Sequence, residues 1–117
     1  MGRILFVMND APYGSERSYN ALRLAGALSK QAEAEVKIFL MGDAASCAKT
    51  NQKVPPGFYN VELMLQTPAR HAAEIGVCWT CMDARGIAEM DLTDGVKRGT
   101  LAQLADWTIW SDKTLVF

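Results

Sequence analysis

The residues with the clearest chemical potential are two cysteines three positions apart, in the segment Cys78-Trp79-Thr80-Cys81. A C-x-x-C motif can serve thiol redox or sulfur chemistry, or it can contribute ligands to a metal ion. The same spacing also occurs where both cysteines only pack, because cysteine behaves as a small apolar residue. The motif alone therefore leaves redox or sulfur chemistry, metal binding and packing open.

The position of the motif favours Cys78 as the reactive thiol. Alternating apolar residues over 73–77 predict a short strand that leads into Cys78, with a helical turn after the motif. Unpaired N–H groups at such a junction stabilise a thiolate, and this effect falls away within the first turn. We therefore expect Cys81 to be the more ordinary thiol. Arg85 either adds positive charge near the thiols, faces solvent or pairs with Asp83.

The other candidate residues have plainer interpretations. A closed zinc site needs four ligands, and only Cys47 and His71 remain outside the pair, without the spacing of a second ligand pair. We expect no metal ion. No Gly-rich phosphate loop follows the first strand, so no nucleotide or flavin cofactor is expected. Cys47 is predicted to pack, His71 to be a solvated residue at a helix end, and Trp79, Trp107 and Trp110 to anchor the core or an interface.

The elements that must position the motif alternate between strands and helices. Buried apolar runs predict strands near residues 3–8, 35–41, 73–78 and 113–117, with a fifth short or irregular strand before Asp91. Helices are expected over 15–31, 44–49, 60–68, 82–87 and from 100 to a turn at 111–112, with a surface loop at 51–57 and an irregular stretch at 92–99. Pro68 is expected to end or restart its helix. This alternation predicts a three-layer α/β sandwich with a mostly parallel sheet.

Four polar residues are expected to cap the starts of these helices. They are Ser15, Asp43, Asn60 and Thr100, and Gln103 follows Thr100 at the spacing of a capping box. The final helix is the best signalled of the set.

Length and charge limit the classes of protein and partner. A chain of 117 residues predicts a single domain over 1–117. Its 12 Lys and Arg against 13 Asp and Glu leave a net charge of -1, which provides no field for holding nucleic acid. The apolar run at 4–8 is too short for a signal peptide or a membrane span, so we expect a cytoplasmic protein with no membrane partner. In that reducing compartment a structural disulfide is not expected.

Several segments together resemble the DsrE/DsrF-like family, especially its YchN-like subgroup. They are Ala11-Pro12-Tyr13-Gly14-Ser15-Glu16, Asn20-Ala21-Leu22-Arg23-Leu24-Ala25, Phe39-Leu40-Met41, Cys78-x-x-Cys81-x-x-x-Arg85-Gly86-Ile87, Asp94-Gly95-Val96 and Asp112-Lys113-Thr114-Leu115-Val116-Phe117. They are spread over the whole chain, and together they are far more specific than the cysteine motif.

The resemblance implies a five-stranded α/β sandwich, assembly into a homotrimer or homohexamer, and a link to intracellular sulfur relay. In the sulfurtransferases of the family, one cysteine before an Arg-Gly pair carries sulfur as a persulfide. Cys78, eight residues before Gly86, matches that position. Cys81 matches the second cysteine of the YchN-like subgroup, which the sulfur carriers do not generally have. It either resolves a persulfide, forms a disulfide with Cys78 or does neither.

Three functions follow as expectations. The first is a sulfur carrier or sulfurtransferase in which a Cys78 persulfide passes sulfur between donor and acceptor proteins. The second is a non-catalytic oligomeric protein that binds a ligand or regulates a partner. The third is a thiol–disulfide redox protein that uses Cys78 and Cys81.

Overall fold

The computed structural model describes residues 1–117, and its strands form one five-stranded sheet. The strands are β1 (Gly2–Met8), β2 (Ala34–Leu40), β3 (Glu74–Cys78), β4 (Val96–Gly99) and β5 (Lys113–Val116). Their order is β4-β3-β2-β1-β5, and every neighbouring pair is parallel. The predicted α/β fold is confirmed, with a sheet that is parallel throughout.

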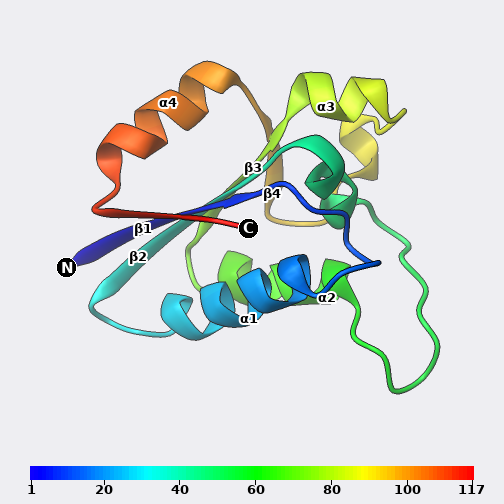
Figure 1. Cartoon of the computed structure of the whole chain (residues 1–117), viewed down its shortest axis with the longest axis horizontal. Coiled ribbons are helices and arrows are strands. Elements are labelled where there is room, and N and C mark those ends of the chain that lie inside the picture. The colour runs from blue at the N-terminus through cyan, green and yellow to red at the C-terminus, as the bar shows by residue number, and fades with distance from the viewer.

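Helices cover both faces of the sheet. Figure 1 shows α1 (Arg17–Ser29) and α2 (Val61–Arg70) on one face and α4 (Leu101–Trp110) on the other. Three short elements complete the chain: α3 (Trp79–Ala84) and the 3-10 helices η1 (Gly42–Ala48) and η2 (Glu89–Asp91). Because η1 follows β2 and α3 follows β3, both lie at the carboxyl ends of the strands, where sites of parallel sheets are usually built.

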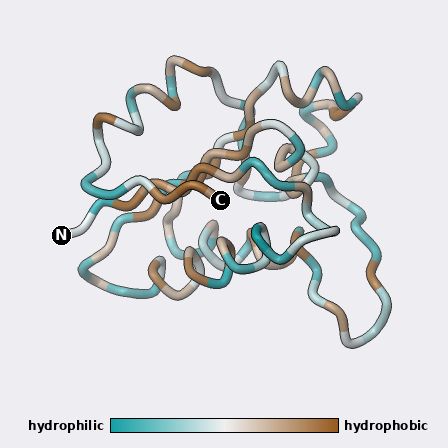
Figure 2. Tube along the Cα trace, in the orientation of Figure 1, coloured by the Kyte–Doolittle hydropathy of each residue, from teal (hydrophilic) through white to brown (hydrophobic).

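Side-chain alternation divides the interior into two unequal parts. In β1, Ile4, Phe6 and Met8 belong to a core of 21 buried residues that includes residues of α1 and α2. Leu5 points to the other face and packs with Phe39 and Trp107, which we call the α4-side cluster. Figure 2 shows the strands as the most hydrophobic part of the trace. The burial of β1 on both faces explains why its sequence is a continuous apolar run.

The fifth strand is where the prediction was wrong. It lies at Val96–Gly99, inside the stretch expected to be irregular, and the segment between β3 and Asp91 holds α3 and η2 but no strand. Val96 is its one large apolar residue and is buried, whereas Lys97 and Arg98 are exposed. Four residues with one apolar side chain have no periodicity to detect, so this edge strand is defined by its pairing with β3.

Pro68 neither ends nor restarts its helix, because α2 continues to Arg70. Proline removes only its own N–H, and Pro68 lies close enough to the end that little of the helix depends on that bond. Its carbonyl accepts hydrogen bonds from the N–H groups of His71 and Ala73, at 3.0 Å each, and these bonds close the helix. Pro68 is also buried, so packing compensates for the missing donor.

Two of the four expected caps are confirmed. Asn60 Oδ1 accepts from the N–H of Leu63 at 3.2 Å, and Thr100 Oγ1 accepts from the N–H of Gln103 at 3.2 Å. Ser15 is not a cap, because α1 begins one residue later after Glu16. Asp43 lies within the first turn of η1, where its carboxylate has a partner from another element.

None of the helices is both long enough and apolar enough to cross a membrane.

Candidate functional site

The cysteine pair lies at the junction between β3 and α3. Cys78 is the last residue of β3 and the N-cap of α3, and Cys81 is the third residue of that helix. The helix therefore begins at Trp79, three residues before the predicted start at 82. Ile75 and Val77 face the large core, so strand alternation turns Cys78 to the opposite face, beside the α4-side cluster. Both thiols are free and half-buried.

Hydrogen bonds around Cys78 favour its thiolate. Its Sγ lies 3.2 Å from the hydroxyl oxygen of Thr80 and within reach of the Cys81 thiol. Partial burial opposes ionisation of Cys78. Hydrogen bonds from the Cys81 thiol, the Thr80 hydroxyl and the backbone N–H groups of both residues outweigh that burial and lower the pKa of Cys78. Because α3 has only six residues, these local donors carry the stabilisation and not the dipole of a long helix.

Cys81 has the opposite balance. Burial and the hydrogen bond with Cys78 raise its pKa, and the negative charge of the Cys78 thiolate adds to the effect. The N–H of Gly42 donates to Cys81 Sγ at 3.2 Å and opposes this shift, as does the charge of Arg85. The directions of the two pKa shifts agree with the expected order of acidity, in which Cys78 ionises first.

Arg85 has a partner that the sequence did not indicate. Its Nη2 lies 2.8 Å from Asp43 Oδ1, and its Nε donates to the same oxygen at 3.3 Å. Its Nη1 donates to the carbonyl of Cys81 at 3.1 Å. The expected pairing with Asp83 is therefore wrong: Arg85 joins α3 to η1, stays partly exposed, and adds positive charge near Cys81. Asp43 is 42 positions away in the chain, so no local pattern could have identified the pair.

Gly42, like Asp43, is a residue of the site that the sequence did not indicate. Its φ of +56° is a backbone conformation that other residues adopt at a cost. In this conformation, at the start of η1, the N–H of Gly42 donates to Cys81 Sγ. A glycine directly after a predicted strand was visible in the sequence, but its target in α3 was not.

A cavity of about 370 Å³ opens beside Cys78. It is lined by Trp79, Arg98, Gly99 and Thr100. Gly99 is the residue of β4 paired with Cys78, which places this space next to the strand end that carries the thiol. Trp79 keeps 43% of its surface exposed, so it offers an apolar wall to a ligand.

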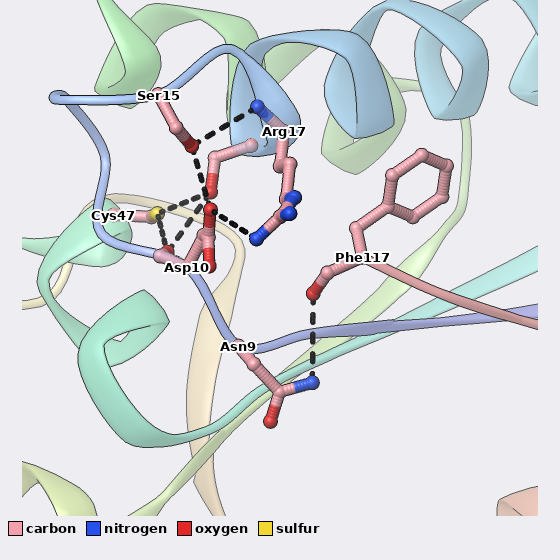
Figure 3. A network of polar contacts seen from close by, with 7 residues as sticks. Asn9, Asp10, Ser15, Arg17, Cys47 and Phe117 are labelled. Carbon is pink, nitrogen blue, oxygen red and sulfur yellow. Dashed lines mark hydrogen bonds and ion pairs between the residues drawn. The ribbon is translucent and has the colours of Figure 1, made fainter.

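Cys47 lies apart from the pair and is buried in the large core. Figure 3 shows it next to Asp10, in the loop between β1 and α1. Its Sγ lies 3.8 Å from the Asp10 carbonyl and 3.8 Å from the Ser18 hydroxyl. Burial raises the pKa of Cys47 to about 12. The hydrogen bond with Ser18 lowers this pKa and the negative charge of Asp10 raises it. Such a thiol is uncharged at neutral pH and inaccessible, which matches its predicted packing role.

The remaining candidates take no part in this site. His71 is exposed at the end of α2, where its Nδ1 lies 2.8 Å from the carbonyl of Thr67. Trp107 is buried in the α4-side cluster and meets Phe39 edge to face. No group of three or more His, Cys, Asp or Glu residues lies together as metal ligands would.

Comparison with known proteins gives matches over the whole chain. The model of the DsrE/DsrF-like family matches residues 2–117. Protein YchN of Escherichia coli strain K12 is 44% identical over 118 residues, covering 100% of both chains. An uncharacterized protein of Methanopyrus kandleri is 38% identical over 114 residues, covering 97% of this chain and 93% of that one. A crystal structure of the E. coli YchN protein superimposes with a TM-score of 0.93, at 44% identity and full coverage of both chains.

Proposed function

The chain belongs to the DsrE/DsrF-like family, a sulfur-relay-related family, and we propose that it is a sulfur carrier that holds sulfur as a persulfide on Cys78. The observation that carries this proposal is the environment of the Cys78 thiol. It is partly exposed, its paired residue Gly99 lines a cavity, and hydrogen bonds lower its pKa. A thiolate is the nucleophile that sulfur transfer requires.

The transfer has two steps. In the first, the Cys78 thiolate attacks the sulfane sulfur of a donor, a new S–S bond forms, and the donor leaves as a thiolate with the electron pair of the broken bond. In the second, an acceptor thiolate attacks the outer sulfur and Cys78 leaves as a thiolate. The Thr80 hydroxyl, 3.2 Å from Cys78 Sγ, and the nearby N–H groups stabilise that leaving group.

The partners follow from this chemistry and from the family. We propose a cytoplasmic homotrimer or homohexamer that exchanges sulfur with donor and acceptor proteins. The cavity beside Cys78 is large enough for a small sulfur-bearing group or the tip of a donor segment. No nucleic acid or membrane partner is proposed.

The test is mass spectrometry of the protein after exposure to inorganic polysulfide, a sulfane-sulfur donor. With the persulfide trapped by alkylation while the donor is still present, we expect the wild type and Cys47→Ala to carry sulfur on Cys78, and Cys78→Ser to carry none at that position. Cys47→Ala is the matched control, because Cys47 is buried away from the site.

Other outcomes of this test identify the alternatives. A Cys78 that takes up no sulfur and alkylates no faster than a free cysteine indicates a non-catalytic ligand-binding or regulatory protein. Exchange of the Cys78–Cys81 pair with disulfides, without sulfur uptake, indicates a thiol–disulfide redox protein.

A further inference from the structure

Cys81 is a second thiol at the site that the carrier chemistry above leaves unused. Its Sγ is held by the N–H of Gly42 at 3.2 Å and lies within hydrogen-bonding reach of the Cys78 thiol. Its backbone carbonyl is held by Arg85 at 3.1 Å. The Cys81 thiol thus accepts a hydrogen bond from η1 and bonds with the Cys78 thiol, two contacts that packing alone would not require.

The spacing of the pair on α3 allows the two sulfurs to bond. Cys78 is the N-cap and Cys81 is three residues on, the two positions that a capping box links by reciprocal side-chain-to-backbone hydrogen bonds. Residues three apart on a helix have Cβ atoms about 5–6 Å apart, and a disulfide needs about 3.5–4.5 Å. A small adjustment within the first turn of this short helix is enough to close that difference.

We infer that Cys81 resolves the sulfur-loaded form of Cys78 and releases the carried sulfur as hydrosulfide. This inference rests on the proposed function, because it requires the Cys78 persulfide. The Cys81 thiolate attacks Cys78 Sγ, and a bond forms between the two Sγ atoms. The bond from Cys78 Sγ to the outer sulfur breaks, and that sulfur leaves with the electron pair and takes up the proton that Cys81 lost on ionising, so that it departs as HS⁻. The outer sulfur is thereby reduced and the two cysteines are oxidised to a disulfide, which a cellular dithiol or low-molecular-weight thiol then reduces.

Loading of Cys78 is also the event that prepares Cys81 for attack. In the unloaded protein, burial comes first among the causes that raise the pKa of Cys81, followed by the hydrogen bond and the charge of Cys78. A persulfide on Cys78 moves the negative charge from Sγ to the outer sulfur and so weakens both effects of Cys78. The N–H of Gly42 and the charge of Arg85 remain, and both favour the Cys81 thiolate.

The internal attack competes with transfer to an acceptor. An acceptor thiol attacks the outer sulfur, whereas Cys81 attacks Cys78 Sγ from within the same helix turn, without having to diffuse to the site. Sulfur therefore passes on when an acceptor is bound and leaves as hydrosulfide when none is bound. The structure thus adds a sulfide-releasing activity to the carrier.

The test follows sulfide and protein mass after loading with inorganic polysulfide and removal of excess donor, in the absence of reductant. For the wild type and Cys47→Ala, we expect stoichiometric sulfide and a final mass two hydrogen atoms below that of the reduced protein, with the disulfide mapped to Cys78 and Cys81. For Cys81→Ser, we expect a stable mass gain of one sulfur atom and a rate of sulfide release at least about tenfold lower, since the attacking thiolate is absent.

The persulfide carrier and the resolving role of Cys81 are tested separately by these variants. If Cys81→Ser takes up no sulfur, the persulfide carrier itself is wrong. If Cys81→Ser loads normally but the wild type keeps its added sulfur just as long, only the resolving role is wrong. Sulfide release that produces disulfide-linked pairs of chains in place of the Cys78–Cys81 bond also overturns that role.

Discussion

At the scale of single residues, the three cysteines share one side chain but lie in three different environments. Cys78 is surrounded by hydrogen-bond donors, Cys81 is held between Cys78 and the N–H of Gly42, and Cys47 is buried in the core. The order of their acidity follows from these contacts. Each environment has its own consequence for reactivity.

We expect alkylation at Cys78 to reach half of its maximal rate at a lower pH than alkylation at Cys81, because only the thiolate reacts and the pKa values shift in opposite directions. Cys47 should react only after unfolding, since burial raises its pKa to about 12. Peptide mass spectrometry after timed iodoacetamide treatment across a pH series measures the alkylation rate of each cysteine. If Cys81 reached half of its maximal rate at the lower pH, Cys81 and not Cys78 would be the more acidic thiol.

Removing the hydroxyl of Thr80 should slow alkylation of Cys78 at neutral pH. In Thr80→Val, the thiolate loses one hydrogen bond, which raises the pKa of Cys78. A hydrogen bond worth about 0.5 kcal/mol changes the thiolate population roughly twofold. Thr108→Val is the matched control, because Thr108 donates to the carbonyl of Leu104 on α4. Equal rates in both variants would show that the Thr80 hydroxyl does not stabilise the thiolate.

At the scale of elements, the site depends on the contact between η1 and α3. Asp43 of η1 and Arg85 at the end of α3 form the ion pair that joins them, and Gly42 supplies its N–H to Cys81. The ion pair is partly exposed, so its contribution to overall stability is small. The ion pair links the start of η1 to the end of α3, the helix that carries Cys81.

Replacing Gly42 should therefore change both stability and the chemistry of Cys81. Gly42→Ala places a side chain at a φ of +56°, which costs about 1–2 kcal/mol, and any shift of its N–H weakens the bond to Cys81 Sγ. We expect denaturant unfolding to show that loss and Cys81 to alkylate at a higher pH. Gly57→Ala, at a φ of +88° in an exposed loop, should lose similar stability and leave Cys81 unchanged. Unchanged titration of Cys81 in both variants would contradict the role of the Gly42 N–H.

At the scale of the whole molecule, the α4 face of the sheet is covered less completely than the other. The α4-side cluster has three buried residues, against 21 in the core that includes α1 and α2. Leu101 and Ile109 on α4 keep 73% and 85% of their surface exposed. Val116 of β5 lies on this same face by strand alternation and is 67% exposed. Exposed apolar residues of this size are typical of an interface between subunits.

We expect light scattering at micromolar concentration to give a trimer or hexamer of the 12.8 kDa chain. Val116→Lys should lower that mass, because it places a charge on the less covered face. Leu63→Lys is the matched control, since Leu63 of α2 is 58% exposed and lies away from that face. A wild type of monomer mass would contradict the assembly, and an unchanged mass for Val116→Lys would place the interface elsewhere.

The α/β fold, four of the five strands and the caps at Asn60 and Thr100 could be predicted from the sequence. These features depend on local apolar patterns and on side chains that bond to their own helix, so neighbouring residues contain the information. The cysteine motif and the resemblance to the family were visible in the same way. Cys78 could be singled out because a strand-to-helix junction is also a local feature.

The position of β4 and the surroundings of the two thiols could be described only from the folded chain. The four residues of β4 become a strand because β3 offers a free edge, and no pattern within them signals it. The contacts of Gly42 with Cys81 and of Asp43 with Arg85 join segments 39 and 42 residues apart. Such contacts exist only after the strands have brought their carboxyl ends together, which is why the balance between the two cysteines could be described only from the fold.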